Sequence, residues 1–285
     1  MKLQRLLSLT RQAVDDYRLI QSGDKIAIGI SGGKDSLTLL YALQGLRRFY
    51  PEPFELCAIT VDLGFQALSP EVSNRLSPTL SSDAAAFDLK PVQELCDELN
   101  VPYTVVPTEI GKILFETRQE SNPCALCAKM RKGALNEAAI KLGCNKIALG
   151  HHFDDVIETI LMGMLYSGKI ETMMPKLHSQ NFEGMELIRP MYLIKEDAVK
   201  AWRDYNGLQF IQCACRFTEN CVSCGGGRGS KRDEMKELIA HFRKESDVIE
   251  KNIFKSVHNI NLKTVIGYHK DDWTYNFLDD YNDKK

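Results

Sequence analysis

The chain has 285 residues, of which 44% are hydrophobic and 26% are charged, and its formal net charge is −2. This composition is typical of a globular protein with its own core, and it excludes binding of nucleic acid through overall positive charge. No apolar run reaches the roughly 18 residues of a membrane-spanning helix. Arg5 and Arg11 interrupt the apolar stretch that a signal peptide would need. We therefore expect a cytoplasmic protein that does not bind a membrane.

Short runs rich in β-branched residues alternate with helical patterns along most of the chain. This alternation predicts an α/β fold, a parallel sheet with helices on both faces, because parallel strands need crossover connections. The predicted strands are 24–30, 54–63, 101–107 and 145–150, and the predicted helices that follow them are 36–49, 88–100, 127–143 and 153–166.

The pattern changes at two places. Residues 66–87 are rich in Ser, Pro and Ala without a clear period, which predicts an inserted loop. After about residue 167 come a helix at 196–206, a cysteine cluster and two charged helices, which predict a small helical C-terminal appendage. The expected organisation is an N-terminal helix (1–22), an α/β domain (23–190), a helical and cysteine-bearing segment (191–268) and a loosely held tail (269–285).

A glycine-rich loop, SGGKDS (31–36), follows the first predicted strand and opens a helix. Consecutive glycines let backbone N–H groups converge on an anion, and the helix N-terminus adds partial positive charge. The loop is not a Walker A motif, because Asp35 follows the lysine where Ser or Thr is required, and GxGxxG cannot be aligned over it. Two interpretations remain: a phosphate-binding loop, or a tight turn that caps the helix through Asp35 or Ser36.

A second motif, GHHFDD (150–155), lies at the end of the fourth predicted strand. Ligands of open parallel sheets bind outside the carboxyl ends of the strands, so this motif and SGGKDS are expected to face one crevice. Asp154 and Asp155 could hold Mg²⁺, and N-capping by Asp154 is compatible with that role. His151 or His152 could transfer protons or make a structural hydrogen bond.

The nine cysteines favour metal or redox chemistry over a disulfide framework, given the expected compartment. Three interpretations are open for the paired cysteines: a shared zinc site, a redox dithiol, or an iron–sulfur cluster. Cys57, Cys96 and Cys144 stand among apolar neighbours and are predicted to be core, while the others form PCALC (Cys124, Cys127) and CACRFTENCVSC (Cys213, Cys215, Cys221, Cys224).

SGGKDS followed by GHHxDD resembles the PP-loop ATP pyrophosphatases, which cleave ATP to AMP and pyrophosphate and adenylate a substrate. PCxLCxxxRxG, SGK (167–169), MPKL (174–177) and IRP (188–190) make residues 1–245 similar to the tRNA 2-thiocytidine synthetase (TtcA) family. The resemblance implies an ATP-dependent tRNA sulfurtransferase. Such an enzyme adenylates O2 of a cytidine, expected to be cytidine 32, and replaces that oxygen with sulfur.

The resemblance also implies the cofactors ATP, Mg²⁺ and a [4Fe-4S] cluster held by three cysteines, which leaves one iron open to bind sulfide. Cys124 and Cys127 match the first two ligands. Cys221 is the predicted third, because the segment from Cys224 onward matches the family without a gap. Cys213 and Cys224 are the alternatives.

The expected ATP and Mg²⁺ ligands are Ser31, Gly32, Gly33, Lys34, Asp35, Ser36, Asp62, Gly150, His151, Asp154 and Asp155, with Asp35, Asp155 and the cysteines Cys124, Cys127 and Cys221 in catalysis. Basic side chains near the cysteine pairs are expected to meet tRNA phosphates, although a solvated helix face would look the same. These are Lys129, Arg131, Lys132, Arg228, Lys231 and Arg232. The expected partners are tRNA and a sulfur donor such as a cysteine desulfurase, and a homodimer is left open.

Rival functions remain from the sequence alone. A PP-loop C–N ligase of the lysidine-synthetase type would use the same ATP site with a structural zinc, but it would need no cluster, so the paired CxxC motifs count against it. Thiolation of a different base or of a small molecule is a further alternative. A non-catalytic, zinc-stabilised RNA-binding protein would leave SGGKDS and GHHFDD without a role.

Overall fold

The computed structural model of the chain describes residues 3–69, 71–72, 88–118, 123–206 and 231–281. A six-stranded sheet runs in the order β3-β2-β1-β4-β6-β5. Its strands are β1 (Lys25–Gly29), β2 (Glu55–Asp62), β3 (Tyr103–Pro107), β4 (Lys146–Ala148), β5 (Lys176–His178) and β6 (Glu186–Ile188). All neighbouring pairs are parallel except the edge strand β5, which is antiparallel to β6. The predicted α/β class is confirmed, and the antiparallel edge is an addition to it.

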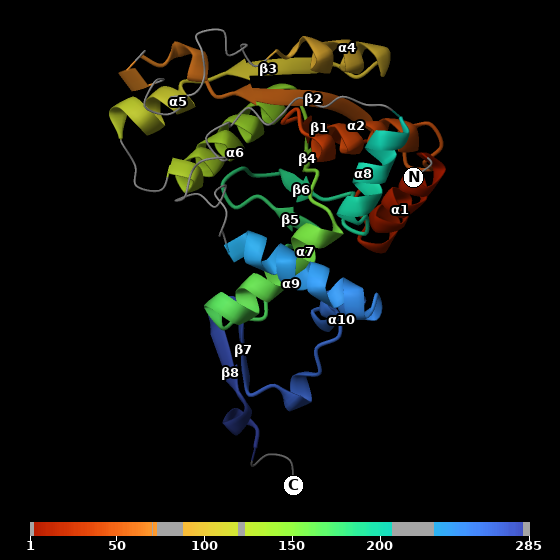
Figure 1. Cartoon of the computed structure of the whole chain (residues 1–285), viewed down its shortest axis with the longest axis vertical. Coiled ribbons are helices and arrows are strands. Elements are labelled where there is room, and N and C mark those ends of the chain that lie inside the picture. The colour runs from red at the N-terminus through yellow and green to blue at the C-terminus, as the bar shows by residue number, and fades with distance from the viewer. Residues whose placement is uncertain (1–2, 70, 73–87, 119–122, 207–230, 282–285) are drawn as a thin grey trace.

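Helices cover both faces of the sheet, as Figure 1 shows. Side chains of β1 alternate between the faces: Ile26 and Ile28 enter one core cluster, whereas Ala27 enters another. The helices of the first face are α1 (Leu3–Asp16), α2 (Lys34–Arg47), α4 (Lys90–Glu98) and α8 (Glu196–Tyr205), and α6 (Pro123–Lys141) covers the second face.

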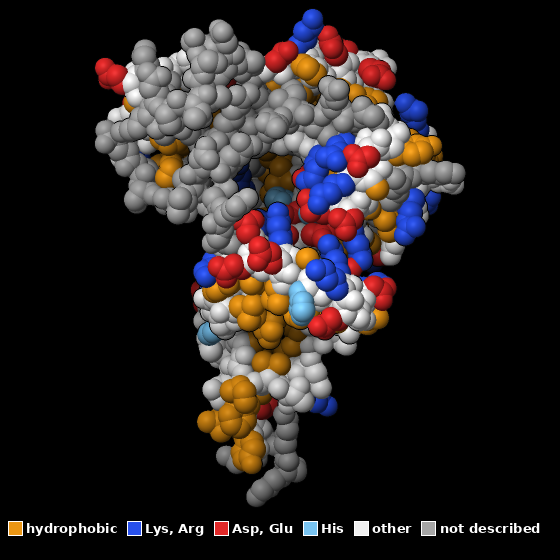
Figure 2. Space-filling view, in the orientation of Figure 1, with side chains coloured by type: hydrophobic (Ala, Val, Ile, Leu, Met, Phe, Trp, Pro, Cys, Tyr) orange, Lys and Arg blue, Asp and Glu red, His pale blue; other side chains and the backbone are white. Residues whose placement is uncertain are grey.

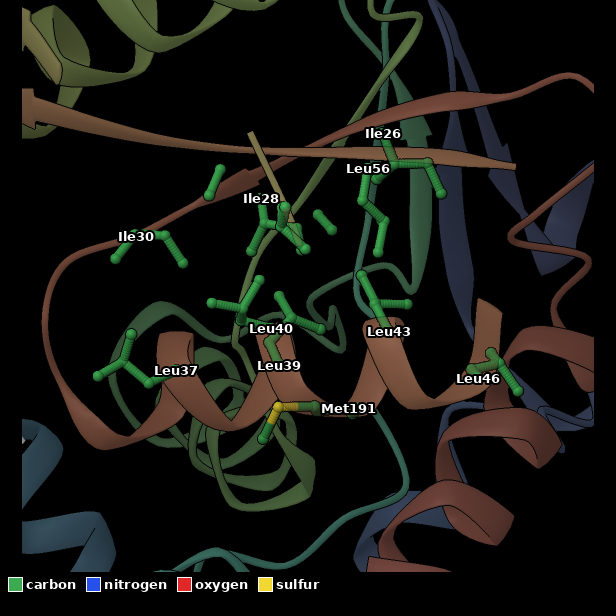
Figure 3. Close-up of a cluster of buried hydrophobic side chains, with 14 of the residues drawn as sticks. Ile26, Ile28, Ile30, Leu37, Leu39, Leu40, Leu43, Leu46, Leu56 and Met191 are labelled. Atoms are coloured by element: carbon green, nitrogen blue, oxygen red, sulfur yellow. The ribbon is translucent and has the colours of Figure 1, made fainter. Parts of the chain in front are cut away.

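The leucines of α2 form the centre of the larger core. In Figure 3, Leu39, Leu40 and Leu43 extend from the helix toward Ile28 and Leu56 of the strands. Each of these side chains is buried, and burial of one such side chain contributes roughly 1.5–3 kcal/mol. This packing fixes the N-terminus of α2, and with it the glycine-rich loop, at the carboxyl edge of the sheet.

Beyond the sheet, α7 (Phe153–Met162), which follows β4, packs with two helices of the predicted C-terminal segment, α9 (Lys231–Glu245) and α10 (Val248–Ser256). α9 lies across α7 (Figure 1), and Phe153 and Ile157 of α7 pack against Met235 and Ile239 of α9. None of the described helices combines the length and the apolar character needed to cross a membrane.

A β-hairpin stands where the sequence predicts a loosely held tail. Its strands are β7 (Gly267–Lys270) and β8 (Trp273–Asn276), joined by a two-residue turn in which Asp271 has a φ of 53°. Tyr268, Trp273 and Tyr275 pack their rings together on it.

The remaining short elements of the described residues are 3₁₀-helices at Phe65–Ala67, Leu262–Thr264 and Phe277–Asp279, α5 (Ile110–Lys112) and π-helical turns at Ile113–Thr117 and Gly163–Ser167. Most of the predicted inserted loop, 66–87, lies outside the described residues. Cys57, Cys96 and Cys144 are buried, as predicted for core cysteines.

Candidate active site

The loops that follow β1 and β4 lie side by side at the carboxyl edge of the sheet. β1 and β4 are parallel neighbours, with Ile28 opposite Ala148. The strand order reverses between them, because β2 and β3 lie on one side of β1 and β6 and β5 on the other. Such a switch point opens a crevice where ligands of parallel sheets bind. SGGKDS (31–36) and GHHFDD (150–155) therefore lie together at one edge of the sheet, as predicted.

The SGGKDS loop turns directly into α2. Gly32 has a φ of 80°, a conformation that glycine adopts without strain. Gly33 is the N-cap, and no side chain caps the helix, so the interpretation as a capping turn through Asp35 or Ser36 is wrong. Ser36 closes the loop instead, because its Oγ donates to the Gly33 carbonyl at 3.0 Å and accepts from the Ser31 N–H at 3.2 Å. A glycine turn at a helix N-terminus without a side-chain cap is suited to an anion.

Gly150 brings the two loops into contact. A Cβ at this position would lie 2.9 Å from the carbonyl carbon and oxygen of Asp35 and 3.1 Å from the Ser36 nitrogen. These neighbours are backbone atoms, so no side-chain rotation can relieve the contact. The loop after β4 therefore packs directly on the first turn of α2.

A Gly150→Ala variant should push the first turn of α2 away from the loop after β4. We expect a loss of about 1–3 kcal/mol in unfolding free energy, the usual range for overpacking, and weaker binding of ATP. Thermal denaturation and ATP titration measure both. Gly133→Ala in α6, where an added Cβ meets nothing within 4 Å, is the matched control and should not lose stability. Equal melting temperatures and ATP affinities in Gly150→Ala and the unaltered protein would contradict this packing argument.

Lys34, the first residue of α2, is the cation of the loop. Its Nζ lies 3.1 Å from a carboxylate oxygen of Asp35 and 3.1 Å from Glu196 Oε1 at the start of α8. Burial alone would lower the pKa of Lys34, but the two carboxylates raise it above its ordinary value. Burial alone would raise the pKa of Glu196, but Lys200 and Lys34 lower it to about 2. A phosphate that binds Lys34 would therefore compete with an ionised Glu196 for its charge.

Asp35 has one carboxylate oxygen that makes no hydrogen bond. Its Oδ2 accepts from Lys34, whereas Oδ1 is buried and has no hydrogen-bond partner within the described part of the chain. His152 Nε2 lies 3.9 Å from that oxygen, which is too far for a hydrogen bond. A buried oxygen without a partner costs free energy unless a donor or a cation binds it. Asp35 therefore fits Mg²⁺, which takes oxygen ligands.

Asp154 holds the start of another helix rather than its own. It is buried, and its Oδ2 accepts the backbone N–H of Glu196, the first residue of α8, at 2.6 Å. Its Oδ1 pairs with Arg243 of α9. Both oxygens are thus engaged by the protein, and the expected role of Asp154 in Mg²⁺ binding stays a prediction.

Asp155 caps α7 and pairs with α9. Its carboxylate accepts the His152 N–H at 2.9 Å and lies 3.0 Å from Arg232 Nη2. Arg232 also pairs with the buried Glu158, at 2.6 Å. Arg232 was expected to meet tRNA phosphates, but it lies against α7 in this structure. Figure 2 shows basic and acidic side chains intermixed over α8 and α9.

Three charged residues of the site were not anticipated from the sequence. Glu196 begins α8, which packs on α2, and Arg243 belongs to α9, which packs on α7; no local pattern marks either residue. Arg189 follows β6, and its Nε donates to His151 Nδ1 at 3.3 Å. The only signal for it was its place in IRP, at the end of a strand at the same sheet edge.

Cys127 lies at this edge of the sheet too. It is buried in the first turns of α6 and packs with Leu63 and Leu114. Leu63 directly follows Asp62, the last residue of β2. Asp62 Oδ1 accepts the Gly64 N–H at 3.0 Å and so shapes the turn after that strand. The first CxxC segment therefore begins at the sheet edge that carries SGGKDS.

The other predicted metal ligands and some basic residues lie beyond the described structure. Within it, no group of three or more His, Cys, Asp or Glu side chains is arranged to hold a metal. The predictions that fall outside the described residues are the side chain of Cys124 and residues Cys213, Cys215, Cys221, Cys224 and Arg228. Lys129 and Lys132 are exposed on α6 and Arg131 is half-buried, while Lys231 lies over the Tyr166 ring, 4.5 Å from its centroid, and pairs with Glu234.

Comparison with known proteins shows the family of the chain. Residues 4–216 match the PP-loop domain family. The chain belongs to the PP-loop family. It is 35% identical over 264 residues to a tRNA-cytidine(32) 2-sulfurtransferase of Syntrophotalea carbinolica (92% of each chain) and 32% identical over 266 residues to one of Geobacter sulfurreducens (93% of each chain).

A solved structure shares this PP-loop fold. The U34-tRNA thiolase NcsA from Methanococcus maripaludis, solved with its [4Fe-4S] cluster, superposes with a TM-score of 0.61 at 22% identity. The superposition covers 93% of this chain and 84% of that one. At this identity, the likeness is one of fold.

Proposed function

We propose that this chain is an ATP-dependent tRNA sulfurtransferase that converts cytidine 32 of tRNA into 2-thiocytidine. The observation that carries the proposal is the shared sheet edge of the SGGKDS loop and the first CxxC segment, because it unites an adenylating site with thiol ligands. The relatives named tRNA-cytidine(32) 2-sulfurtransferase support the choice of nucleotide.

The first half of the reaction activates the base. Backbone N–H groups of residues 31–36 and the Lys34 ammonium would bind the phosphates of ATP, and Asp35 Oδ1 would be the protein ligand of Mg²⁺. O2 of the cytidine then attacks the α-phosphate and pyrophosphate leaves. The product is an O-adenylate at C2, whose charge development the oriented donors stabilise.

The second half replaces oxygen by sulfur. Cys124 and Cys127, three residues apart in the first turns of α6, are suited to holding one side of an iron–sulfur cluster, with Cys221 as the proposed third ligand. When bound, the cluster would supply sulfide-level sulfur, which would take the place of AMP at C2 and give 2-thiocytidine. Lys129, Arg131 and Lys132 would hold tRNA phosphates near this end of α6.

Metal analysis of protein purified without oxygen tests the proposal. We expect a brown protein with stoichiometric iron and sulfide and with ATP- and tRNA-dependent release of pyrophosphate. A colourless protein with one zinc after attempted reconstitution would contradict it and favour a C–N ligase with a structural zinc site. Pyrophosphate release alone would not separate these two enzymes.

Replacement of Cys221 by alanine should remove the cluster and abolish thiolation while pyrophosphate release persists. Cys96→Ala is the matched control, because this cysteine is buried in the core on the face of the sheet opposite α6. This variant should retain iron. Iron and sulfide per chain are the measurement. Full iron in Cys221→Ala would move the third ligand to Cys213, Cys215 or Cys224.

The proposal extends to partners. A sulfur donor such as a cysteine desulfurase would supply persulfide sulfur after each turnover, in the cytoplasm, and a two-electron reductant such as a thiol would convert it to sulfide. The oligomeric state is the last property to test. Light scattering of the protein with and without tRNA would show whether it forms a homodimer.

A further inference from the structure

Arg189 is fixed at the site by several bonds. It is 8% exposed and directly follows β6. Its backbone N–H donates to the Pro175 carbonyl at 2.9 Å, and its Nη1 donates to the Met174 carbonyl. Its guanidinium also contacts His151, whose Nδ1 accepts from Nε at 3.3 Å. The guanidinium is thus oriented by backbone before it meets the imidazole.

This contact determines where the imidazole carries its proton. A guanidinium has five N–H donors and no acceptor, and burial lowers the pKa of Arg189 only to about 10, so it donates at any neutral pH. The Nδ1 of His151 must then offer its lone pair. A neutral imidazole with a bare Nδ1 carries its hydrogen on Nε2.

Burial and most of the surrounding charges also favour a neutral His151. Burial is the largest influence on His151 and Arg189 the next, and together they lower its pKa to about 4. Asp155 opposes the shift, whereas Arg232 and His152 add to it. These groups come from α7, α9 and the loop after β4. A proton on Nδ1 would also have to break the bond to Arg189.

We propose that Arg189 is a positioning residue that holds His151 as a neutral hydrogen-bond donor, with its hydrogen on Nε2, and not as a base. The loop of His151 packs on the backbone of Asp35 through Gly150. An N–H donor in that position suits an anionic phosphate oxygen during adenylation, and this last step rests on the proposed function. Of the two roles considered for His151, a fixed N–H donor corresponds to hydrogen bonding and not to proton transfer.

Nitrogen NMR of protein labelled with ¹⁵N-histidine tests the tautomer without relying on activity. The chain has six histidines, and His151→Gln assigns the signal. In the unaltered protein we expect the Nε2–H tautomer of His151 to persist from pH 8 to pH 5.5. A His151 that titrates near its ordinary pKa of about 6.5, or that carries its hydrogen on Nδ1, would overturn the proposal.

Two variants assign the effect to Arg189. In Arg189→Met, which removes the donor to Nδ1, we expect the Nδ1–H tautomer of His151 to become populated beside the Nε2–H tautomer at pH 8. Tyr192→Phe is the matched control, since its hydroxyl donates to the neighbouring Met173 carbonyl at 2.8 Å and does not touch the imidazole. It should leave the His151 signal unchanged. If Arg189→Met does not fold, the spectrum of the unaltered protein still decides the tautomer.

Kinetics test the donor role. We expect His151→Ala to lose about 100-fold in pyrophosphate release, and His151→Gln, which keeps an N–H donor, to recover at least 10-fold of that loss. Equal rates in the two variants would refute the donor role. If the unaltered protein released no pyrophosphate while the tautomer was as stated, the proposed function would fail and the positioning by Arg189 would stand.

Discussion

A Lys34→Met variant should release pyrophosphate from ATP about 100- to 1,000-fold more slowly than the unaltered protein. Lys34 begins α2 at the anion-binding loop and carries a charge that Asp35 and Glu196 stabilise. Methionine keeps the length of the side chain and removes the charge that would offset the phosphates. The lysine side chain is 24% exposed and its pairs are peripheral to the core, so the fold should be retained. Single-turnover pyrophosphate release and a thermal melt measure the two properties.

Two companion variants make that experiment specific. Lys200→Met removes another cation that contacts Glu196, at 3.0 Å, but it does not reach the loop, and it should keep the rate within about twofold. Glu196→Gln removes a carboxylate that would compete with the phosphates for Lys34 and should tighten ATP binding. Turnover of Lys34→Met within threefold of the unaltered protein would remove Lys34 from the ATP site.

A Lys146→Met variant should lose about 3–5 kcal/mol of unfolding free energy, the usual result of removing one partner of a buried ion pair. Lys146 is 1% exposed at the start of β4. Its Nζ lies 3.1 Å from Asp24, 2.8 Å from Glu186 and 3.0 Å from the Leu19 carbonyl. Without the ammonium, the buried Asp24 carboxylate loses its counter-charge. Urea denaturation followed by circular dichroism measures the loss.

Lys25→Met, at the start of the neighbouring strand, is the control. Its pair with the exposed Glu55 is 3.8 Å long and should contribute at most about 1 kcal/mol. Burial alone would raise the pKa of Glu186, but Lys146 and Lys176 lower it. This stabilisation is present above the unfolded carboxyl pKa of about 4.3 and is lost as the pH falls through the lower folded value. The two lysine variants should therefore differ less in acid than at pH 7, and a similar loss in both would contradict the buried network.

Two parts of the site, the SGGKDS loop and the GHHFDD loop, could be predicted from the sequence. Local residue patterns and the topology of a parallel sheet are sufficient to place them. The β-branched run before SGGKDS and the leucines after it predict strand, turn and helix from a dozen neighbouring residues. GHHFDD after a fourth strand then meets SGGKDS because parallel strands end at one edge. Gly150 shows how close that meeting is, since its missing side chain makes room for the backbone of Asp35.

The parts that escaped prediction depend on contacts between segments far apart in the chain. Arg232 looks like any basic residue on a helix, and only the docking of α9 on α7 pairs it with Asp155. The bond from Arg189 to His151 likewise joins the ends of two different strands. The hairpin after α10, by contrast, is a local structure. Its two short strands, YHK and WTY, flank the Asp-Asp turn directly, so it could have been predicted from neighbouring residues.

The two arginines of α9 also bear on where the catalytic unit of this chain ends. The match to the PP-loop domain stops at residue 216, before α9 begins at Lys231. A fragment cut at that point would contain Asp154 and Asp155 but lack Arg232 and Arg243, and the buried acid would face the crevice without its counter-charge. Arg243 is itself held by Glu250 of α10. The shortest fragment that preserves these ion pairs therefore extends through α10, well past the end of the PP-loop domain match.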